Sequence, residues 1–452
     1  MKIIIVGCGK VGKTLAEQLS AEDNDITVID MVADKVKAIS NEIDVIGVVG
    51  SSTNHSVLRE ADIANADLLI AVTGSDELNL LCCVIAQTAS KCQTIARVRN
   101  PEIHREIAAI KEALGLSMVI NPELISAEEI ARVLRFPSAI DIETFAKGRV
   151  EILKFRLPED SVLCNLTLRE MTAKGYGEVL VCMVERDNEI MIPNGNSILR
   201  AKDIVSIVAN PRSVNRFFKK IKVESNQVRD TMIIGGGKLS YYLAQILLDM
   251  GIEVKIIEKD KARCDFLCER LPKATIIYGD GVDQNLLMEE GLDYTESFVT
   301  LTNIDEENIL LSLTVKDKTK AKVVTKVSSI TFDDVINKLD LDSVVYPRYE
   351  TAERIIRYVR AMGNSIGSNV ETLHHLAGRQ AEALEFIIKE QAAVIDISLA
   401  ELSLKENILI GCINRGGNII IPKGQDKMML GDTVVVVTTI RGLGDISDIL
   451  KE

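Results

Sequence analysis

The residues best suited to chemistry are three glycines near the start of the chain. They belong to the run Gly7-Cys8-Gly9-Lys10-Val11-Gly12, which directly follows the apolar stretch 3–6 and opens a helical pattern. In this spacing the first glycine makes a tight turn, the second lets the backbone approach a pyrophosphate, and the third lets helix and strand pack closely. The free N–H groups at the start of the helix attract an anion. The run therefore predicts a site for a nucleotide phosphate.

An acidic residue stands where the ribose of such a nucleotide would lie. Asp30 ends the second apolar stretch, 26–30. A carboxylate at this place accepts hydrogen bonds from the 2′- and 3′-hydroxyl groups and repels a 2′-phosphate. We therefore expect NAD(H), or another adenine nucleotide with free ribose hydroxyls, rather than NADP(H).

The same pattern returns in the second half of the chain, where TMIIGGGKLSYYLAQIL aligns with KIIIVGCGKVGKTLAEQL. Gly235 and Gly237 are retained, Ser240 replaces the third glycine, and Glu258 stands at the position of Asp30. Serine is small enough for close helix–strand packing, and glutamate is an accepted substitute at the ribose position. We expect a second nucleotide site, with a purely structural relic of the first as the alternative.

Polar residues also follow the fourth and fifth apolar stretches of each half. Thr73-Gly74 and Thr302-Asn303 follow the fourth, and Arg97 and Lys326 lie in the fifth. Ligands of open parallel sheets bind at these strand ends, so a threonine can meet ribose or adenine and a cation can meet phosphate. The alternative is that the threonines simply end strands and the cations are solvated.

Apolar runs alternate with helical patterns in the first part of each half. In the first copy, the runs are 3–6, 26–30, 45–50, 68–72 and 94–98, and the helices are 12–20, 34–41 and 77–89. This alternation indicates βαβ units and a parallel, doubly wound sheet. Aromatic residues are only 4% of the chain, so the cores must consist of Ile, Val, Leu and Ala, as is typical of buried parallel sheets.

The end of each half has a different pattern. Residues 122–135 predict an amphipathic connector helix, followed by a loop at 136–140. The apolar positions of this helix could close the sheet, but they suit an interface with a partner helix equally. Residues 150–218 alternate like a small sheet with one or two helices. The fold class is thus α/β: two Rossmann-like doubly wound parallel-sheet domains, each followed by a small α+β C-terminal module, in tandem duplication. We expect Rossmann-like domains at 1–122 and 229–347, connector helices with linkers at 123–149 and 348–379, and small modules at 150–222 and 380–452.

Composition excludes several function classes. The formal net charge of −13 argues against a nucleic-acid partner. No run reaches about 18 apolar residues, and Met1 leads directly into a strand-like run, so we expect a cytoplasmic protein. The nine cysteines are an odd number without a CxxC pair, and we interpret them as small buried side chains: Cys8, Cys82, Cys83, Cys92, Cys164, Cys182, Cys264, Cys268 and Cys412.

The order of these motifs resembles a known family. The duplicated arrangement of KIIIVGCGKVGKTLAEQL, DITVID, VLREADIANADLLIAVTGSDELNLL and IARVRNPE, with halves that close in IPNG…LRAKDIV or IPKG…LGDTVVVV, resembles the TrkA family. Its members are peripheral cytosolic subunits of Trk-type potassium uptake systems and carry regulator-of-potassium-conductance domains. The resemblance covers essentially the whole chain.

The resemblance implies a function and a set of ligand contacts. It implies a homo-oligomeric ring on the inner face of the plasma membrane, in which NAD(H) or ATP/ADP gates an integral membrane potassium-conducting partner without enzymatic turnover. Carried over to this sequence, the contacts are Gly7, Cys8, Gly9, Lys10, Val11, Gly12, Asp30, Thr73, Gly74 and Arg97 in the first half. In the second half they are Gly235, Gly237, Lys238, Leu239, Glu258, Thr302 and Lys326, with Ser240 as a departure. Lys10, Lys13, Arg97 and Arg99 are the cations that we expect to sense the phosphate tail.

An NAD-dependent oxidoreductase is the main alternative. Such an enzyme needs a substrate domain and a proton-handling group, but the duplication leaves no unduplicated domain. The four histidines, His55, His104, His374 and His375, have no shared position in the two halves, and we interpret the adjacent pair as a solvated helix face. We interpret the acidic residues Asp280, Asp283, Asp305, Glu306 and Glu307 as helix-start and surface charges rather than a cation site.

Overall fold

The computed structural model divides the chain into two compact units. One unit contains Met1–Ala131 and Arg229–Ile356, and the other contains Arg132–Val228 and Arg357–Glu452. The structure describes residues 1–22, 24–187, 189–223, 227–328, 336, 339, 341–363, 370–376, 380–389 and 392–451. Within these residues, no helix is long and apolar enough to cross a membrane.

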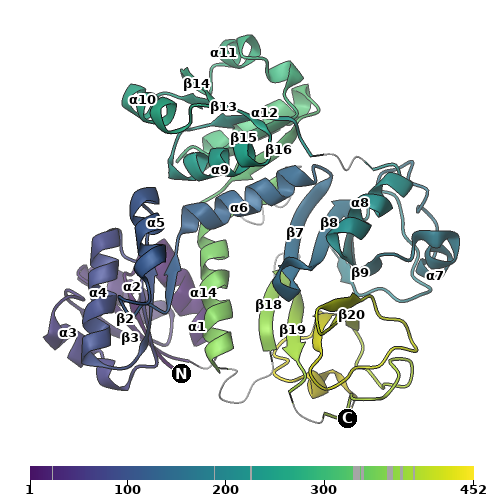
Figure 1. The fold of residues 1–452 in the computed structure, drawn as a ribbon, viewed down its shortest axis with the longest axis horizontal. Coiled ribbons are helices and arrows are strands. Elements are labelled where there is room, and N and C mark those ends of the chain that lie inside the picture. Colours follow the sequence, from purple (N-terminus) through teal and green to yellow (C-terminus); the bar gives the residue numbers. More distant parts are fainter. Residues whose placement is uncertain are drawn as a thin grey trace. The chain divides into compact units, whose positions relative to one another are not determined.

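The first unit contains two parallel six-stranded sheets (Figure 1). The first sheet has the strand order β3-β2-β1-β4-β5-β6. All of its strands are parallel, but successive strands are added on one side of β1 up to β3 and on the other side from β4 onward, as in a Rossmann fold. Its elements are β1 (Lys2–Val6), α1 (Lys10–Ser20), β2 (Asp25–Asp30), α2 (Ala33–Glu42), β3 (Ile46–Val49), α3 (His55–Glu60), η1 (Ile63–Asn65), β4 (Leu68–Ala71), α4 (Asp76–Ala89), β5 (Gln93–Arg97), α5 (Pro101–Ile110), β6 (Met118–Ile120) and α6 (Pro122–Arg135).

The second sheet repeats this topology in the order β14-β13-β12-β15-β16-β17. Its elements are β12 (Asp230–Ile234), α9 (Lys238–Asp249), β13 (Glu253–Glu258), α10 (Lys261–Arg270), β14 (Thr275–Tyr278), α11 (Gln284–Glu289), η4 (Leu292–Tyr294), β15 (Ser297–Thr300), α12 (Asp305–Lys318), β16 (Lys322–Lys326), β17 (Ser343–Val345) and α14 (Pro347–Gly363). The predicted tandem Rossmann-like domains are therefore confirmed.

The helix that follows each sheet contacts the domain of the other half. Asn121, just before α6, donates from Nδ2 to the hydroxyl of Tyr242 on α9 at 2.8 Å. In the reverse direction, Arg348 of α14 lies close enough to Lys13 of α1 to lower its pKa, although the pairing of Lys13 with Glu42 raises that pKa by more. Each Rossmann-like domain is thus contacted by the start of the helix that follows the sheet of the other domain.

The second unit contains two five-stranded antiparallel sheets. The first has the order β10-β9-β11-β8-β7 and the second the order β18-β19-β22-β20-β21. Their elements are β7 (Ala139–Phe145), η2 (Ala146–Gly148), β8 (Val150–Arg156), α7 (Leu168–Met171), η3 (Thr172–Tyr176), β9 (Leu180–Arg186), β10 (Glu189–Met191), β11 (Ile204–Ala209), α8 (Pro211–Lys220), β18 (Val370–Leu376), β19 (Ala381–Ile387), β20 (Ile408–Arg415), β21 (Asn418–Ile420), β22 (Thr433–Thr438) and η5 (Ile446–Ile449).

The two small modules share one hydrophobic core. Phe145, Ile152 and Val208 of the first module pack with Ala383 and Val437 of the second. Burial of one such side chain contributes about 1.5–3 kcal/mol. The modules therefore form one compact pair.

The predicted linkers are partly wrong. We expected a loop at 136–140 and a linker up to 149, but the chain forms β7 there, and β7 pairs along β8. The second predicted linker, within 348–379, likewise contains β18. It also covers residues 364–369 and 377–379, which lie outside the described residues. The edge strands alternate polar and apolar residues weakly, so their pattern resembles a loop until a neighbouring strand is known.

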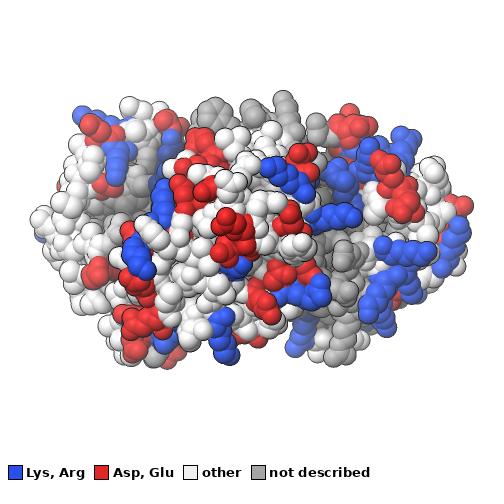
Figure 2. Space-filling view, turned by 90° about the horizontal axis from the view of Figure 1, so that it is seen from above, with Lys and Arg blue, Asp and Glu red and all other residues white. Residues whose placement is uncertain are grey.

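Charged side chains are mixed on the face drawn in Figure 2. Lys and Arg side chains are interspersed there with Asp and Glu side chains.

Candidate functional site

The first glycine loop contains two glycines that the fold itself requires. Gly7 follows β1 with a φ of +103°, and a Cβ there would lie 3.0 Å from the amide nitrogen of Thr73. A Cβ at Gly12 would lie 1.9 Å from the carbonyl oxygen of Gly7. Both positions therefore exclude larger residues even without a ligand.

Gly9 differs because none of the described residues requires a glycine there. Its φ of −80° suits any residue, and a Cβ would meet no atom within 4 Å. Gly9 precedes α1, whose first turn has no side-chain cap and no acidic residue. The space beside Gly9 is thus open and faces free N–H groups at a helix N-terminus, which is the arrangement that favours a phosphate. Gly74 is similarly open.

Asp30 braces the glycine loop. Its Oδ2 accepts a hydrogen bond from the amide of Cys8 at 2.8 Å, and its Oδ1 accepts one from the amide of Val32 at 2.9 Å. The carboxylate keeps further lone pairs for ribose hydroxyls. Asp30 therefore orders the loop in addition to the ribose contact that we predict for it.

A buried asparagine, which the sequence analysis missed, orders the ends of β4 and β5. Asn79 Oδ1 accepts from the amide of Thr73 at 2.8 Å and from its hydroxyl at 2.7 Å. Its Nδ2 donates to the carbonyl of Arg97 at 2.9 Å. Because the Thr73 hydroxyl proton is already donated, a ligand would meet Thr73 Oγ1 only as an acceptor. The repeated segment that contains Asn79 and Asn308 was the signal that could have identified this role.

The predicted phosphate-sensing cations fall into different environments. Arg97 Nη1 lies 3.4 Å from the carbonyl oxygens of both Val72 and Thr73, and burial lowers the pKa of its guanidinium. Lys13 pairs with Glu42 of α2. Lys10 is exposed as the first residue of α1.

Arg99 is the fourth predicted cation. Its Nε donates to Glu123 Oε1 at 2.5 Å in the first turn of α6, and its amide donates to Asp76 at 2.9 Å. Lys13 and Arg99 are therefore both held by acidic partners, whereas Lys10 is exposed and Arg97 lies among the carbonyl groups that follow β4.

Cys8 and Val11 would meet a ligand only through their backbone. Both side chains are buried, and burial raises the pKa of the Cys8 thiol to about 12. A thiol with such a pKa is unreactive. The general prediction of buried cysteines is confirmed for seven of the nine, because Cys164 is only half-buried and Cys268 is exposed.

The second glycine loop has the same frame with a different third residue. Gly235 has a φ of +95°, and a Cβ at Gly237 would meet nothing within 4 Å. The Ser240 hydroxyl donates to the carbonyl of Gly235, which compensates for the lost close packing. Glu258 Oε2 accepts from the amide of Gly236 at 2.5 Å, as Asp30 does for Cys8. Lys238 and Leu239 follow at the start of α9, with Lys238 exposed and Leu239 buried.

The polar network at the strand ends is also repeated. Asn308 Oδ1 accepts from the amide of Thr302 at 3.0 Å, and its Nδ2 donates to the carbonyl of Lys326 at 3.1 Å. Lys326 Nζ lies 3.4 Å from the carbonyl of Leu301 and 3.5 Å from Asn303 Oδ1, and burial lowers its pKa. The structure thus places the predicted contacts of each half at the carboxyl ends of the strands of one sheet.

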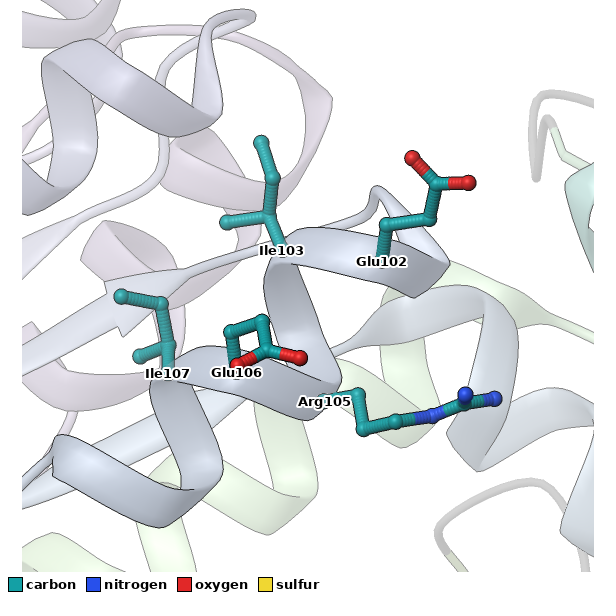
Figure 3. A pocket seen from close by; sticks show the side chains of 5 residues that line it. All are labelled: Glu102, Ile103, Arg105, Glu106 and Ile107. Atoms are coloured by element: carbon teal, nitrogen blue, oxygen red, sulfur yellow. The ribbon is translucent and has the colours of Figure 1, made fainter.

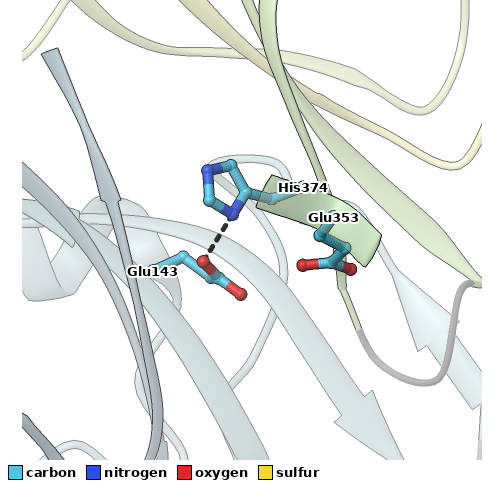
Figure 4. Close-up of side chains that lie close together, drawn as sticks. All are labelled: Glu143, Glu353 and His374. Carbon is cyan, nitrogen blue, oxygen red and sulfur yellow. Dashed lines mark ion pairs between the residues drawn. The ribbon is translucent and has the colours of Figure 1, made fainter. Parts of the chain in front are cut away.

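The interpretation of the histidine pair is wrong. His374 lies on β18, not on a helix, and its side chain is buried rather than solvated. Its Nδ1 lies 2.5 Å from Glu143 Oε2 (Figure 4), and its Nε2 lies 3.2 Å from Arg357 Nη1. Burial raises the pKa of Glu143 to about 8. The pattern VETLHHL does not distinguish a short buried strand from a helix.

The acidic residues of the second half lie as predicted at turns and helix starts. Asp283 caps α11 by accepting from the amide of Asn285, and Asp305 begins α12 and accepts from the amide of Ser328. Asp280 accepts from the amide of Val282 in the preceding turn.

A surface hollow of about 450 Å³ lies apart from the glycine loops. It lies along α5 and is lined by Glu102, Ile103, Arg105, Glu106 and Ile107 (Figure 3). None of the predicted nucleotide contacts lines it, so it is not part of the candidate site.

Comparisons with known proteins agree with this geometry. The chain is 31% identical to the Trk system potassium uptake protein TrkA of Haemophilus influenzae, over 96% of this chain and 95% of that protein. It is 30% identical to the Trk system potassium uptake protein TrkA homolog 1 of Methanosarcina mazei, over 100% of both chains.

Among solved structures, the GsuK RCK domain matches with a TM-score of 0.63 and 17% identity, over 96% of this chain and 92% of that one. The GsuK channel bound to NAD matches with the same score and identity, over 97% of this chain and 76% of that chain. At this identity the likeness shows a shared fold.

The TrkA-N domain family matches residues 3–122 and 231–347, the two Rossmann-like sheets with their glycine loops. The TrkA-C domain family matches residues 152–222 and 383–451, the two small modules. With most of its length in these domains, the chain belongs to the TrkA family.

Proposed function

We propose that this chain is a cytosolic regulatory subunit of a potassium uptake system. It binds NAD(H), ATP or ADP at its glycine loops and thereby gates an integral membrane potassium-conducting partner. Relatives that match over nearly their whole length are called Trk system potassium uptake proteins. The related fold of GsuK has been solved with NAD and with ADP.

The open space beside Gly9 carries the proposal. Gly7 and Gly12 are explained by the protein's own packing, but Gly9 and Gly237 are not, because a Cβ at either would meet no atom within 4 Å. A glycine that the free chain does not need is explained by a ligand that approaches the backbone. The uncapped N-terminus of α1 supports a phosphate in that ligand, and the acid at the end of β2 supports a ribose.

A chain of contacts can transmit ligand binding away from the site. The amides of Arg99 and Asn100 donate to Asp76 at the start of α4, and the Arg99 side chain donates to Glu123 of α6. Helix α6 continues to Arg135, which belongs to the second unit. A nucleotide shifts this arrangement only by its different affinity for two states, so phosphate tails of different charge exert different effects.

The remaining parts of the proposal concern assembly. The chain acts as a homo-oligomeric ring at the inner face of the plasma membrane and performs no turnover. An NAD-dependent oxidoreductase would need a separate substrate domain, whereas both Rossmann-like domains are followed by the same small module.

Gly9→Val tests the proposal. The φ of Gly9 suits valine and its Cβ would meet no described atom within 4 Å, so we expect the domain to fold while the branched side chain occupies the proposed phosphate space. We expect nucleotide affinity in that half to fall by about a hundredfold, the scale of several lost phosphate hydrogen bonds. Potassium uptake in vesicles reconstituted with the membrane partner should lose the part of its nucleotide response that depends on the first half.

The matched control is Gly195→Val, a position in the first small module where the nearest atoms to a Cβ lie 3.8 Å away. It should leave binding and flux unchanged. If Gly9→Val folds and loses nucleotide, yet nucleotide-dependent potassium flux persists unchanged, the regulatory role of the first half is wrong.

A further inference from the structure

The two ribose corners carry different side chains on the same frame. Asp30 is the register partner of Val49, and Glu258 is the register partner of Tyr278. Val49 is 49% exposed and Tyr278 is 61% exposed, so each lines the open end of its sheet beside the acid. An exposed aromatic ring offers a stacking surface for a base, which valine does not.

The cations of the two corners also differ. The second corner has Lys259, Lys261 and Arg263 where the first has Met31, Ala33 and Lys35. The second corner therefore holds three cations in the space of five residues, and the first holds one.

Arg263 is built into the second glycine loop. Its Nε donates to the carbonyl of Gly236 at 2.5 Å, and its guanidinium lies 4.5 Å from the centre of the Phe266 ring. Gly236 also donates its amide to Glu258, so the acid and the arginine hold opposite sides of one peptide segment. Within the described residues, Lys35 forms no equivalent bond to the first loop.

The charge of Glu258 is thus accompanied by a fixed cation. Both of its carboxylate oxygens accept backbone N–H groups, from Gly236 at 2.5 Å and from Asp260 at 2.8 Å. The two Nη groups of Arg263 have no hydrogen-bond partner among the described residues. Lys261 Nζ lies 5.8 Å from the centre of the Tyr278 ring, which places a second cation at this corner.

We propose that the second-half site accepts adenine dinucleotides that carry a phosphate on the adenosine ribose, and that Arg263 determines this ligand class. The inference rests on the proposed nucleotide binding. A planar guanidinium with free Nη groups binds a phosphate through two parallel hydrogen bonds. In dinucleotide-binding folds an arginine in the ribose corner accommodates a 2′-phosphate, where an acid alone binds the 2′-hydroxyl; here Arg263 lies close enough to Glu258 to offset the charge of its carboxylate. The first site, with Asp30 and no such arginine, rejects the same ligands.

The test measures each site alone in the full-length chain. We expect Gly9→Val to retain the second site and Gly237→Val to retain the first, because a Cβ at either glycine would meet no described atom within 4 Å. NADH and NADPH are titrated into both variants by calorimetry. We expect similar affinities for the two ligands in Gly9→Val, and NADPH weaker than NADH by about tenfold or more in Gly237→Val, the scale of one charged interaction.

Arg263→Gln in the Gly9→Val background distinguishes phosphate binding by Arg263 from its structural role in holding the second glycine loop. A phosphate contact predicts that NADPH affinity falls about tenfold while NADH affinity changes little. Lys35→Gln in the Gly237→Val background is the matched control and should leave the ratio of the two affinities unchanged.

Four outcomes overturn the inference, and the last of them also overturns the proposed function. An NADPH affinity far below that of NADH in Gly9→Val removes the proposed ligand class, and an equal loss of both ligands in Arg263→Gln makes the residue a structural brace only. If Gly9→Val binds neither ligand while Gly237→Val binds NADH, the second half holds no dinucleotide, and the proposed function survives through the first half. If neither variant nor the unmodified chain binds any nucleotide, the proposed function itself fails.

Discussion

The two glycine loops share what the backbone needs and differ in what a ligand would touch. Gly7 and Gly235 have positive φ, and Asn79 and Asn308 make the same set of hydrogen bonds. The ribose corners and the third glycine position differ instead. A duplication of this kind distinguishes residues that maintain the strand ends from residues that select a ligand. The structural residues are the same in both halves because their role does not depend on which ligand binds.

The small modules show the structural side of this comparison. Arg186 binds Asp203 through two hydrogen bonds of 2.7 Å, and Arg415 binds Asp432 at 2.9 and 2.8 Å. Both aspartates are buried. This repeated clasp explains why an aspartate recurs after IPNG and IPKG, and no ligand is needed to account for it.

The largest expected effect comes from the shared asparagines. Asn79→Ala leaves the amide of Thr73 and the carbonyl of Arg97 without their partner, which costs about 3 kcal/mol of stability. Asn308→Ala should cost a similar amount in the second domain. Hydrogen exchange of β4 and β15 measures each domain separately. The exposed Asn196→Ala is the control, and stability loss in one half alone would contradict the equivalence of the two networks.

The third glycine position should respond differently in the two halves. In Gly12→Ser the new Cβ would lie 1.9 Å from the carbonyl oxygen of Gly7, so we expect a loss of about 2 kcal/mol from overpacking. Ser240→Gly removes a single hydrogen bond and should cost about 1 kcal/mol. Thermal unfolding of both variants checks this. Equal stability of Gly12→Ser and the unmodified chain would show that both loops tolerate serine.

Sequence reasoning succeeded where residue spacing has one physical solution. The run from Gly7 to Gly12 between an apolar strand and a helix allows only the βα turn, and the structure has it, with α1 beginning at Lys10. The helix 122–135 was predicted with its observed bounds because its amphipathic pattern and Pro122 define it locally.

Sequence reasoning failed where a neighbouring strand decides the structure. Residues 139–145 form β7 because β8 lies beside them, and His374 is buried because Glu143 lies on that strand. Glu143 is far in sequence from His374, and β8, although it follows β7 after a short turn, leaves no sign of its pairing in the local pattern of residues 139–145. Asn79 was overlooked for a similar reason, since a polar residue in a helix is usually solvated and only the tertiary fold places its amide between two strand ends.

Substitution of Lys322 should have a smaller effect on stability, and this effect should depend on pH. It begins β16 and is buried, whereas Gln93 at the same place in β5 is exposed. Burial lowers the pKa of Lys322 to about 8, below its ordinary 10.5. The folded chain therefore disfavours the charged amine, and the unfolded chain binds more protons between these two pH values. The loss of folding stability caused by burying the charge is therefore full below pH 8 and disappears towards pH 10.5.

Lys322→Gln removes that penalty and should raise the stability of the second domain by about 1 kcal/mol at pH 7. The gain should shrink as the pH rises above 8. Denaturant unfolding at several pH values checks this. A gain that grows with pH would contradict the assigned direction.

The ribose acid of the first half provides the last and most selective test. Asp30 holds the amide of Cys8 and, in our proposal, the ribose hydroxyls. In the Gly237→Val background, which leaves only the first site, Asp30→Ala should lower affinity for NADH because the loop and the ribose both lose an acceptor. The repulsion of a 2′-phosphate disappears at the same time, so the preference for NADH over NADPH should narrow by about tenfold, or about 1.4 kcal/mol. Calorimetry with both ligands measures the ratio, and Asp34→Ala, in the first turn of α2, is the acidic control. Equal affinities for NADH and NADPH before any change to Asp30 would show that this carboxylate does not select the ligand.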